Sequence, residues 1–231
     1  MIELAKGQEL ALTGTDGEAL TTLRFGVGWD KDPTAGFISS GRADVDLDAS
    51  AVQFADGQLF DLAFYNNLTT RDGSVTHLGD NQTGSGQADD EALTVDLGKV
   101  YAKVDTIVFL VSSYQGHALE WISNAYCRLV DIRGADEGGE VELARFTLTL
   151  GVPQTGLAMA KIYRDGDVWK IRAIGEGIAV TQPARSVEAL KRFLCPCEQR
   201  RPSVGLSFAP PESTRPAVAR RGTFSYAPTP A

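Results

Sequence analysis

The chain is dominated by short runs in which every second residue is apolar. Runs such as LTTLRFGVGW, TIVFLVSSY and VELARFTLTL are rich in Val, Ile, Phe and Thr, and Gly, Asp or Asn residues separate them. Strands of this kind present one face to a core and the other to solvent, and many of them at short spacing are typical of a sandwich. We therefore predict an all-β protein, a two-sheet antiparallel β-sandwich.

The end of the predicted sandwich carries two local signals. In YRDGDVWK, Asp165 and Gly166 suit the two-residue type I′ turn of a hairpin. PARSVEALKRFL then predicts a short C-terminal helix with Ser186 as its N-cap. Residues 195–231 are rich in Pro, Ser, Ala and Arg without a sustained period, so we expect an extended tail or linker after a domain of residues 1–194.

Charge is distributed unevenly along the chain. Residues 30–96 carry thirteen acidic residues against three basic ones, a local net charge of −10. Residues 195–231 carry five Arg against two Glu, a net charge of +3. The acidic part would repel a phosphate backbone, so we expect no nucleic acid at the main domain. A cation is the partner that this charge favours.

Neither targeting signals nor cysteines suggest an exported protein. The first residues, MIELAKGQEL, lack the charged start and apolar stretch of a secretory signal, and no apolar run is long enough for a transmembrane segment. We therefore expect a cytoplasmic protein. Cys127 lies in a strand-like run and is predicted to be a buried apolar thiol, while Cys195 and Cys197 give only a weak metal signal.

Carboxylates alternate with apolar residues in RADVDLDASAVQF. A strand would place Asp44, Asp46 and Asp48 on one face, about 6.7 Å apart, with the apolar residues on the other face. Each neighbouring pair would repel by about 2.5 kcal/mol at an effective dielectric constant of 20. A solvated face tolerates this repulsion, whereas a crowded site requires a counter-ion.

Further oxygen donors occur in GVGWD, FYNNL and the glycine-rich stretch GDNQTGSGQADDE, without interleaved His or Cys. All-oxygen ligands favour a hard cation over zinc, and mixed carboxylate, amide and carbonyl donors suit calcium better than magnesium. The spacing is not that of an EF-hand, because Ala49 and Ala55 stand where its Gly and Glu would be. From composition alone, a metal site and a solvated acidic face both stay open.

A set of motifs occurs in this chain in the order RFGVGWD, DVDLDASA, FYNNL, DGSVTHLGDNQTGSGQADDE, SNAYCRLVD and EVELARF. This ordered set resembles the TerD family of bacterial tellurium-resistance and stress-response proteins. The resemblance covers residues 1 to about 194. It implies a β-sandwich that binds two calcium ions in a cleft lined by acidic loops. Gln87 and Ala88 depart from the Asp-Gly pair of related sequences, so we expect one or two ions here.

Carried over by motif, the implied metal ligands are Asp30, Asp44, Asp46, Asp48, Asn66, Asp80, Asn81, Thr83, Gly84, Asp90 and Glu91.

The function implied by this resemblance is a non-enzymatic calcium-binding stress-response module, in which calcium orders acidic loops for protein partners, among them other tellurium-resistance or stress proteins. The alternative is a calcium-dependent sandwich that binds a sugar or a lipid head group. A metal-dependent hydrolase is a third hypothesis, for which the sequence offers no convincing general base. The arginine-rich tail suggests a docking arm for an acidic partner or for self-association.

No catalytic constellation is found in the sequence. His77 and His117 are too few and too isolated for a triad, and no nucleophile-elbow, zinc-protease or phosphate-loop pattern occurs. Both histidines are predicted to be structural. Gly26 and Gly28 in FGVGWD do not form a dinucleotide-binding fingerprint, because no helix follows them. We therefore expect no enzymatic activity.

Overall fold

The computed structural model describes residues 1–31, 47–80, 89–113, 115–134, 139–148, 153–180 and 182–194, with the backbone alone for residues 30–31, 80 and 121–124. The chain divides into two units, Met1–Leu194 and Cys195–Ala231. The second unit, and with it the predicted tail, lies outside the described residues. Within the described ranges, no helix has the length and apolar character needed to cross a membrane.

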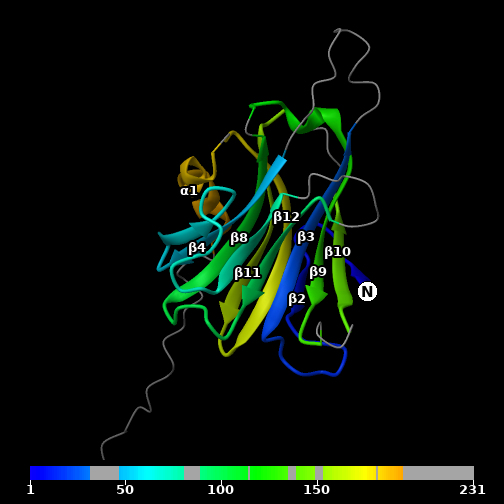
Figure 1. Cartoon of the computed structure of the whole chain (residues 1–231), viewed down its shortest axis with the longest axis vertical. Helices are drawn as coiled ribbons and strands as arrows, with labels where there is room; N and C mark the ends of the chain where they lie inside the picture. The colour runs from blue at the N-terminus through cyan, green and yellow to red at the C-terminus, as the bar shows by residue number, and fades with distance from the viewer. Residues whose placement is uncertain are drawn as a thin grey trace, which may run out of the picture. The chain divides into compact units, whose positions relative to one another are not determined.

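The described residues of the first unit form two sheets of six strands each, and Figure 1 shows several of these strands. The first sheet has the order β1 (Ile2–Glu3), β10 (Val141–Thr147), β9 (Ile122–Asp131), β3 (Thr22–Lys31), β7 (Glu91–Asp96), β6 (Val75–Asp80). The second sheet has the order β2 (Glu9–Ala11), β12 (Val168–Ile178), β11 (Gly156–Asp165), β8 (Val104–Ser113), β4 (Leu47–Ala55), β5 (Gln58–Ala63). Every pair is antiparallel except β1 with β10, which is parallel. The predicted antiparallel sandwich is confirmed apart from this short edge pair.

The core lies between the two sheets because each strand alternates its side chains. Phe25 on β3 and Phe109 on β8 are both fully buried, and their rings stack with centroids 4.0 Å apart. Leu93 on β7 and Ala49 on β4 belong to the same buried cluster. Apolar residues at every second position of both sheets therefore produce one continuous core.

The outer face of the second sheet is also apolar, and a C-terminal segment covers it. This segment consists of the single helical turn α1 (Val187–Leu190) between two 3₁₀ turns, η3 (Pro183–Arg185) and η4 (Lys191–Phe193). Leu190 is fully buried in a cluster with Phe54 and Leu110 of the sheet. The end of the segment is held by Lys161, whose Nζ donates to the Phe193 carbonyl at 2.6 Å.

Two local predictions need correction. The Ser186 hydroxyl does not cap α1 but donates to the Pro183 carbonyl, because Pro183 opens a separate 3₁₀ turn immediately before it. The β11–β12 hairpin is confirmed, but its loop residues are Gly166 and Asp167, one position later than predicted. Of the two, only Gly166 has a positive φ, which fits a type II′ turn and not a type I′ turn.

Candidate metal centre

Carboxylate-bearing positions from four strands meet at one end of the sandwich, which we call the acidic end. Asp30 lies at the end of β3, Asp80 at the end of β6, and Asp90 and Glu91 at the start of β7. These three strands are antiparallel neighbours, and Asp80 pairs directly with Glu91. Asp48 lies at the start of β4 in the other sheet. The topology therefore gathers residues that are up to 61 positions apart in the sequence.

Glu91 connects the two sheets at the acidic end. Its carboxylate accepts a hydrogen bond from the backbone N–H of Ala49 on β4, and its side chain is only 4% exposed. The same carboxylate lies 3.6 Å from Nε2 of His77, whose side chain is also buried. His77 Nδ1 accepts the Gly79 N–H at 3.0 Å, so the neutral ring carries its proton on Nε2, toward Glu91. Among the described residues, the Nε2 atom has no hydrogen-bond partner.

His77 was predicted to be only structural, and its position beside a candidate ligand was missed. The available signal was the spacing in VTHLGD: His77 follows the buried Val75 by two positions, so both side chains point inward. Nothing in the sequence alone paired this inward position with Glu91, because the pairing depends on the register between β6 and β7 and on the approach of β4.

Asp90 is fixed by the main chain of β3. Its backbone N–H donates to the Val27 carbonyl at 2.8 Å, and its carboxylate Oδ2 accepts the Trp29 N–H, also at 2.8 Å. Backbone donors thus hold the carboxylates of both Asp90 and Glu91 at the acidic end. Oxygen donors held in this way suit a hard cation such as calcium.

Asp48 and Asn66 also lie at the acidic end, Asp48 on the outer face of the second sheet and Asn66 in an exposed turn. Leu47 and Ala49 enter the core, so the alternation of β4 turns the half-buried Asp48 to the outer face of the second sheet, where it stands opposite Ser112. Asn66 is exposed in the turn that follows β5. The structure therefore brings both residues to the acidic end.

The rest of the predicted site lies outside the described residues: Asp44, Asp46, Asn81, Thr83, Gly84, and the variant positions Gln87 and Ala88. For Asp30 and Asp80 the backbone alone is described. Among the side chains that are described, no group of three His, Cys, Asp or Glu residues is placed to hold a metal ion. The ligand set from the sequence thus stays a prediction.

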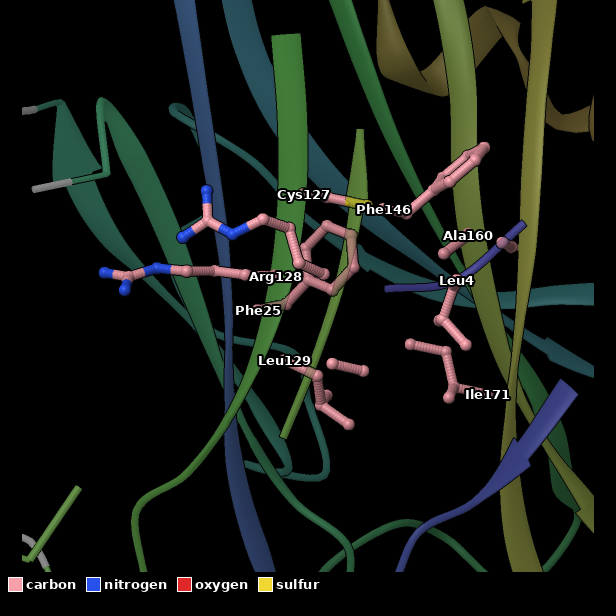
Figure 2. A pocket seen from close by; sticks show the side chains of 11 residues that line it. Leu4, Phe25, Cys127, Arg128, Leu129, Phe146, Ala160 and Ile171 are labelled. Atoms are coloured by element: carbon pink, nitrogen blue, oxygen red, sulfur yellow. The ribbon is translucent and has the colours of Figure 1, made fainter. Parts of the chain in front are cut away.

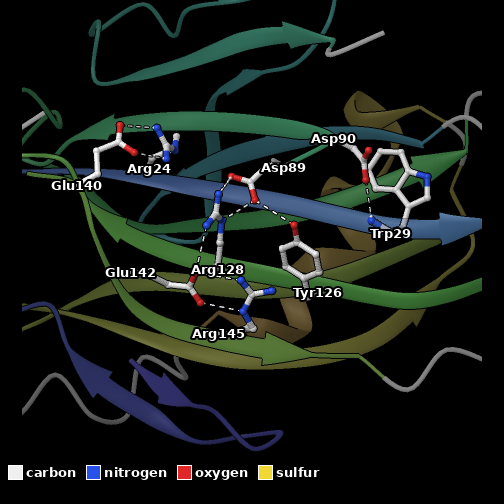
Figure 3. Close-up of polar contacts among 9 residues, drawn as sticks. All are labelled: Arg24, Trp29, Asp89, Asp90, Tyr126, Arg128, Glu140, Glu142 and Arg145. Atoms are coloured by element: carbon white, nitrogen blue, oxygen red, sulfur yellow. Dashed lines mark hydrogen bonds and ion pairs between the residues drawn. The ribbon is translucent and has the colours of Figure 1, made fainter. Parts of the chain in front are cut away.

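Asp89 differs from its two acidic neighbours. Its carboxylate lies on the outer face of the first sheet and forms a two-pronged ion pair with Arg128 of β9 (Figure 3). In the sequence Asp89 stands directly before Asp90 and Glu91, and nothing there distinguishes it from them. For Asp89, the positive charge comes from the chain itself.

A small apolar pocket lies elsewhere, between β3, β9 and β10 of the first sheet and β11 and β12 of the second, with Leu4, Phe25, Cys127 and Ile171 in its lining (Figure 2). Its volume is about 10 Å³, room for a single water molecule. Burial raises the pKa of the Cys127 thiol well above its ordinary value. The prediction of a buried thiol is confirmed, and this pocket is too small for an organic ligand.

Comparison with known proteins identifies the family. The family model described as TerD domain matches residues 1–182. The chain belongs to the TerD family. The resemblance seen in the ordered motifs is thereby confirmed.

Curated relatives in this family include proteins named for tellurium resistance and for stress response. Tellurium resistance protein TerD of Serratia marcescens is 37% identical over 187 residues, covering 77% of this chain and 91% of that protein. Stress response protein SCP2 of Bacillus subtilis (strain 168) is 35% identical over 207 residues, covering 84% of this chain and 99% of that protein. The protein is thus a member of a tellurium-resistance and stress-response family.

Solved structures support the fold. A Streptomyces coelicolor A3(2) homologue of telluride resistance protein TerD superimposes with a TM-score of 0.55 at 18% identity, covering 73% of this chain and 96% of that one. A protein of unknown function, SAV2460, gives a TM-score of 0.59 at 19% identity, covering 74% and 97%. At these identities the likeness shows the sandwich fold alone.

Proposed function

We propose that this TerD-family protein is a non-enzymatic, calcium-binding stress-response module that binds one or two calcium ions at its acidic end. The observation that carries the proposal is the convergence of Asp30, Asp48, Asp80, Asp90 and Glu91 from strands of both sheets. Carboxylates gathered at one end repel one another, and a bound divalent cation offsets that repulsion.

The donor set fits calcium. The candidate side chains offer carboxylate and amide oxygens, and the neighbouring glycine-rich stretch adds backbone carbonyls to the available donors. Asp90 and Glu91 are already oriented by the Trp29 and Ala49 amides, which lowers the entropic cost of binding. Bound calcium would supply positive charge and draw together the strand ends that carry its ligands.

A binding role is supported further by the chemistry of the domain. Cys127 is the one cysteine among the described residues, and its buried thiol with a raised pKa is unsuited to nucleophilic or redox attack on an oxyanion such as tellurite. We infer that protection is indirect, through protein partners of the calcium-loaded form in the cytoplasm.

The sugar- or lipid-binding alternative receives less support. It requires exposed aromatic side chains beside the ions. Among the described side chains, the one strongly exposed aromatic is Tyr101, which precedes β8 at the other end of the sandwich. The partner hypothesis is therefore preferred.

The test is a calcium titration of chelator-stripped protein, followed by thermal unfolding and calorimetry and compared with magnesium. Calcium at 100 times its Kd should add about 2.7 kcal/mol per site. For a domain of this size, that corresponds to a rise in Tm of about 5–11 °C. Magnesium at the same concentration should give a smaller rise.

Two variants on one strand provide the control. E91Q removes a charge at the acidic end of β7 and should weaken calcium binding about tenfold or more. D96N removes a charge at the other end of the same strand, where Asp96 accepts the Gly98 N–H, and should bind calcium as the parent does. No calcium-dependent rise in the parent, or equal losses in E91Q and D96N, would contradict the proposal.

A further inference from the structure

Asp89 is a nearly buried carboxylate held by a guanidinium fork. Arg128 Nε donates to Asp89 Oδ1 at 2.6 Å and Nη2 donates to Oδ2 at 3.0 Å, while the Tyr126 hydroxyl lies 3.4 Å from Oδ1. Two-pronged Arg–carboxylate pairs fix orientation as well as charge. The pair links β9 to the residue that comes two positions before Glu91, across the intervening strand β3.

The two glycines of FGVGWD make this link across β3 possible. A Cβ atom at Gly26 would overlap the Asp89 carboxylate, and one at Gly28 would meet the Tyr126 ring at 2.5 Å. Phe25 and Val27 point into the core, so Gly26 and Gly28 occupy the outer face of β3. Because neither glycine has a side chain, the outer face of β3 leaves space in which Asp89 and Arg128 contact each other.

Arg128 is itself braced from the next strand. Its Nη1 donates to Glu142 Oε2 at 3.1 Å, and Arg145 donates to both oxygens of Glu142 at 2.8 and 3.0 Å (Figure 3). The hydrogen bond with Asp89 raises the pKa of Arg128, and the one from Arg145 lowers the pKa of Glu142. The network therefore stays charged at neutral pH and ties β10, β9 and Asp89 together.

Immediately after this anchor, the chain turns to the acidic end. Asp89 points to the outer face, whereas Glu91 points between the sheets and accepts the Ala49 N–H. Asp90, between them, accepts the Trp29 N–H (Figure 3). Fixing Asp89 thus sets the position from which the next two carboxylates project.

We propose that Asp89 is a positioning residue and not a cation ligand: Arg128, acting across the space left by Gly26, holds Asp89 so that Asp90 and Glu91 face the acidic end. Of the three consecutive acidic residues, Asp90 and Glu91 bind the cation and Asp89 orients them. This inference rests on the proposed calcium site for its functional meaning, while the positioning itself can be measured without metal.

The experiment compares R128K and G26A with matched controls. R128K keeps the charge but loses the fork, and G26A keeps every carboxylate but fills the space beside Asp89. The control R133K alters the Arg133–Asp131 fork at the other end of the sandwich, and G177A adds a methyl group against the Gln154 side chain on the second sheet. Hydrogen exchange of the Trp29 and Ala49 amides is measured in metal-free protein, and the calcium Kd by calorimetry.

We expect R128K and G26A to exchange the Trp29 and Ala49 amides about tenfold faster and to weaken calcium binding by a similar factor, with neither effect in R133K or G177A. A lowered Tm with unchanged exchange at both amides and unchanged Kd would overturn the inference, because Asp89 would then only stabilise the fold. Tighter calcium binding in R128K would also overturn it, since a released Asp89 would be acting as a ligand. Absence of calcium binding in the parent would remove the proposed function, while the amide exchange would still decide the positioning role.

Discussion

Carboxylates at the two ends of the sandwich have different hydrogen-bonding partners. At the end opposite the acidic end, Asp72 lies in the turn before β6 and Asp131 closes β9. Asp72 accepts hydrogen bonds from Thr70, Ser74 and Tyr101. These donors come from the turn itself and from the segment before β8, so the carboxylate connects local elements of the fold.

The Asp131 side chain is neutralised by an arginine two positions away. Arg133 donates to both Asp131 oxygens and also to Asp16. The hydrogen bond from Arg133 lowers the pKa of Asp131. Burial alone would raise the pKa of Asp72, but the hydrogen bonds from Tyr101 and Ser74 outweigh it and lower that pKa overall.

At the acidic end, by contrast, carboxylate-bearing positions of separate strands lie close together, and main-chain amides orient Asp90 and Glu91. An acidic residue thus stabilises the fold where nearby donors enclose it, and becomes a candidate ligand where topology concentrates it with others. The three predictions below test this contrast, in order of decreasing effect.

Asp72→Ala should give the largest loss of stability, about 2–4 kcal/mol, because several hydrogen-bond donors lose a charged acceptor. Calcium affinity should not change, since Asp72 lies at the other end of β6. Urea unfolding of metal-free protein measures the first quantity and calorimetry the second. A calcium affinity reduced as strongly as in E91Q would show that the two ends are not independent.

Asp90→Asn should weaken calcium binding about tenfold, or about 1.4 kcal/mol. The asparagine oxygen can still accept the Trp29 N–H, so the stability of metal-free protein should stay within about 0.5 kcal/mol of the parent. The pair of measurements, calcium Kd and metal-free Tm, separates a ligand from a structural residue. A marked loss of metal-free stability with an unchanged Kd would place Asp90 in the same class as Asp72.

Asp131→Asn should give the smallest effect, below about 1 kcal/mol at neutral pH. Because folding lowers the pKa of Asp131 from 3.8, its contribution is fully present above that value and is lost as pH falls through the lower, folded pKa. The variant should therefore show a shallower fall of Tm than the parent does as the pH is lowered below 3.8. Identical acid profiles would show that the Arg133 fork contributes nothing measurable.

Much of the fold was predictable because alternation is a local property. The period-two runs correctly indicated two packed sheets, and the pattern after Pro183 correctly indicated a short C-terminal helix. The length of that helix was not predictable. Its single turn is fixed by packing of Leu190 on the outer face of the second sheet and by the flanking 3₁₀ turns.

The candidate site was predicted in part. Ordered motifs named Asp90 and Glu91, and both lie at the end of the sandwich where Asp30, Asp48 and Asp80 also arrive. The sequence could not distinguish Asp89 from them, since three adjacent acids look alike until their partners are known.

By itself, the sequence determined the strand periodicity, the concentration of acidic residues and the family, because each of these depends only on neighbouring residues or on their order. Tertiary structure alone decided that Arg128 neutralises Asp89, that His77 faces Glu91 and that Ala49 binds the same carboxylate. These contacts join strands that are distant in the chain, and register and sheet packing set them. The physical reason is that a carboxylate's role depends on which donors lie within about 3 Å, and only folding brings those donors there.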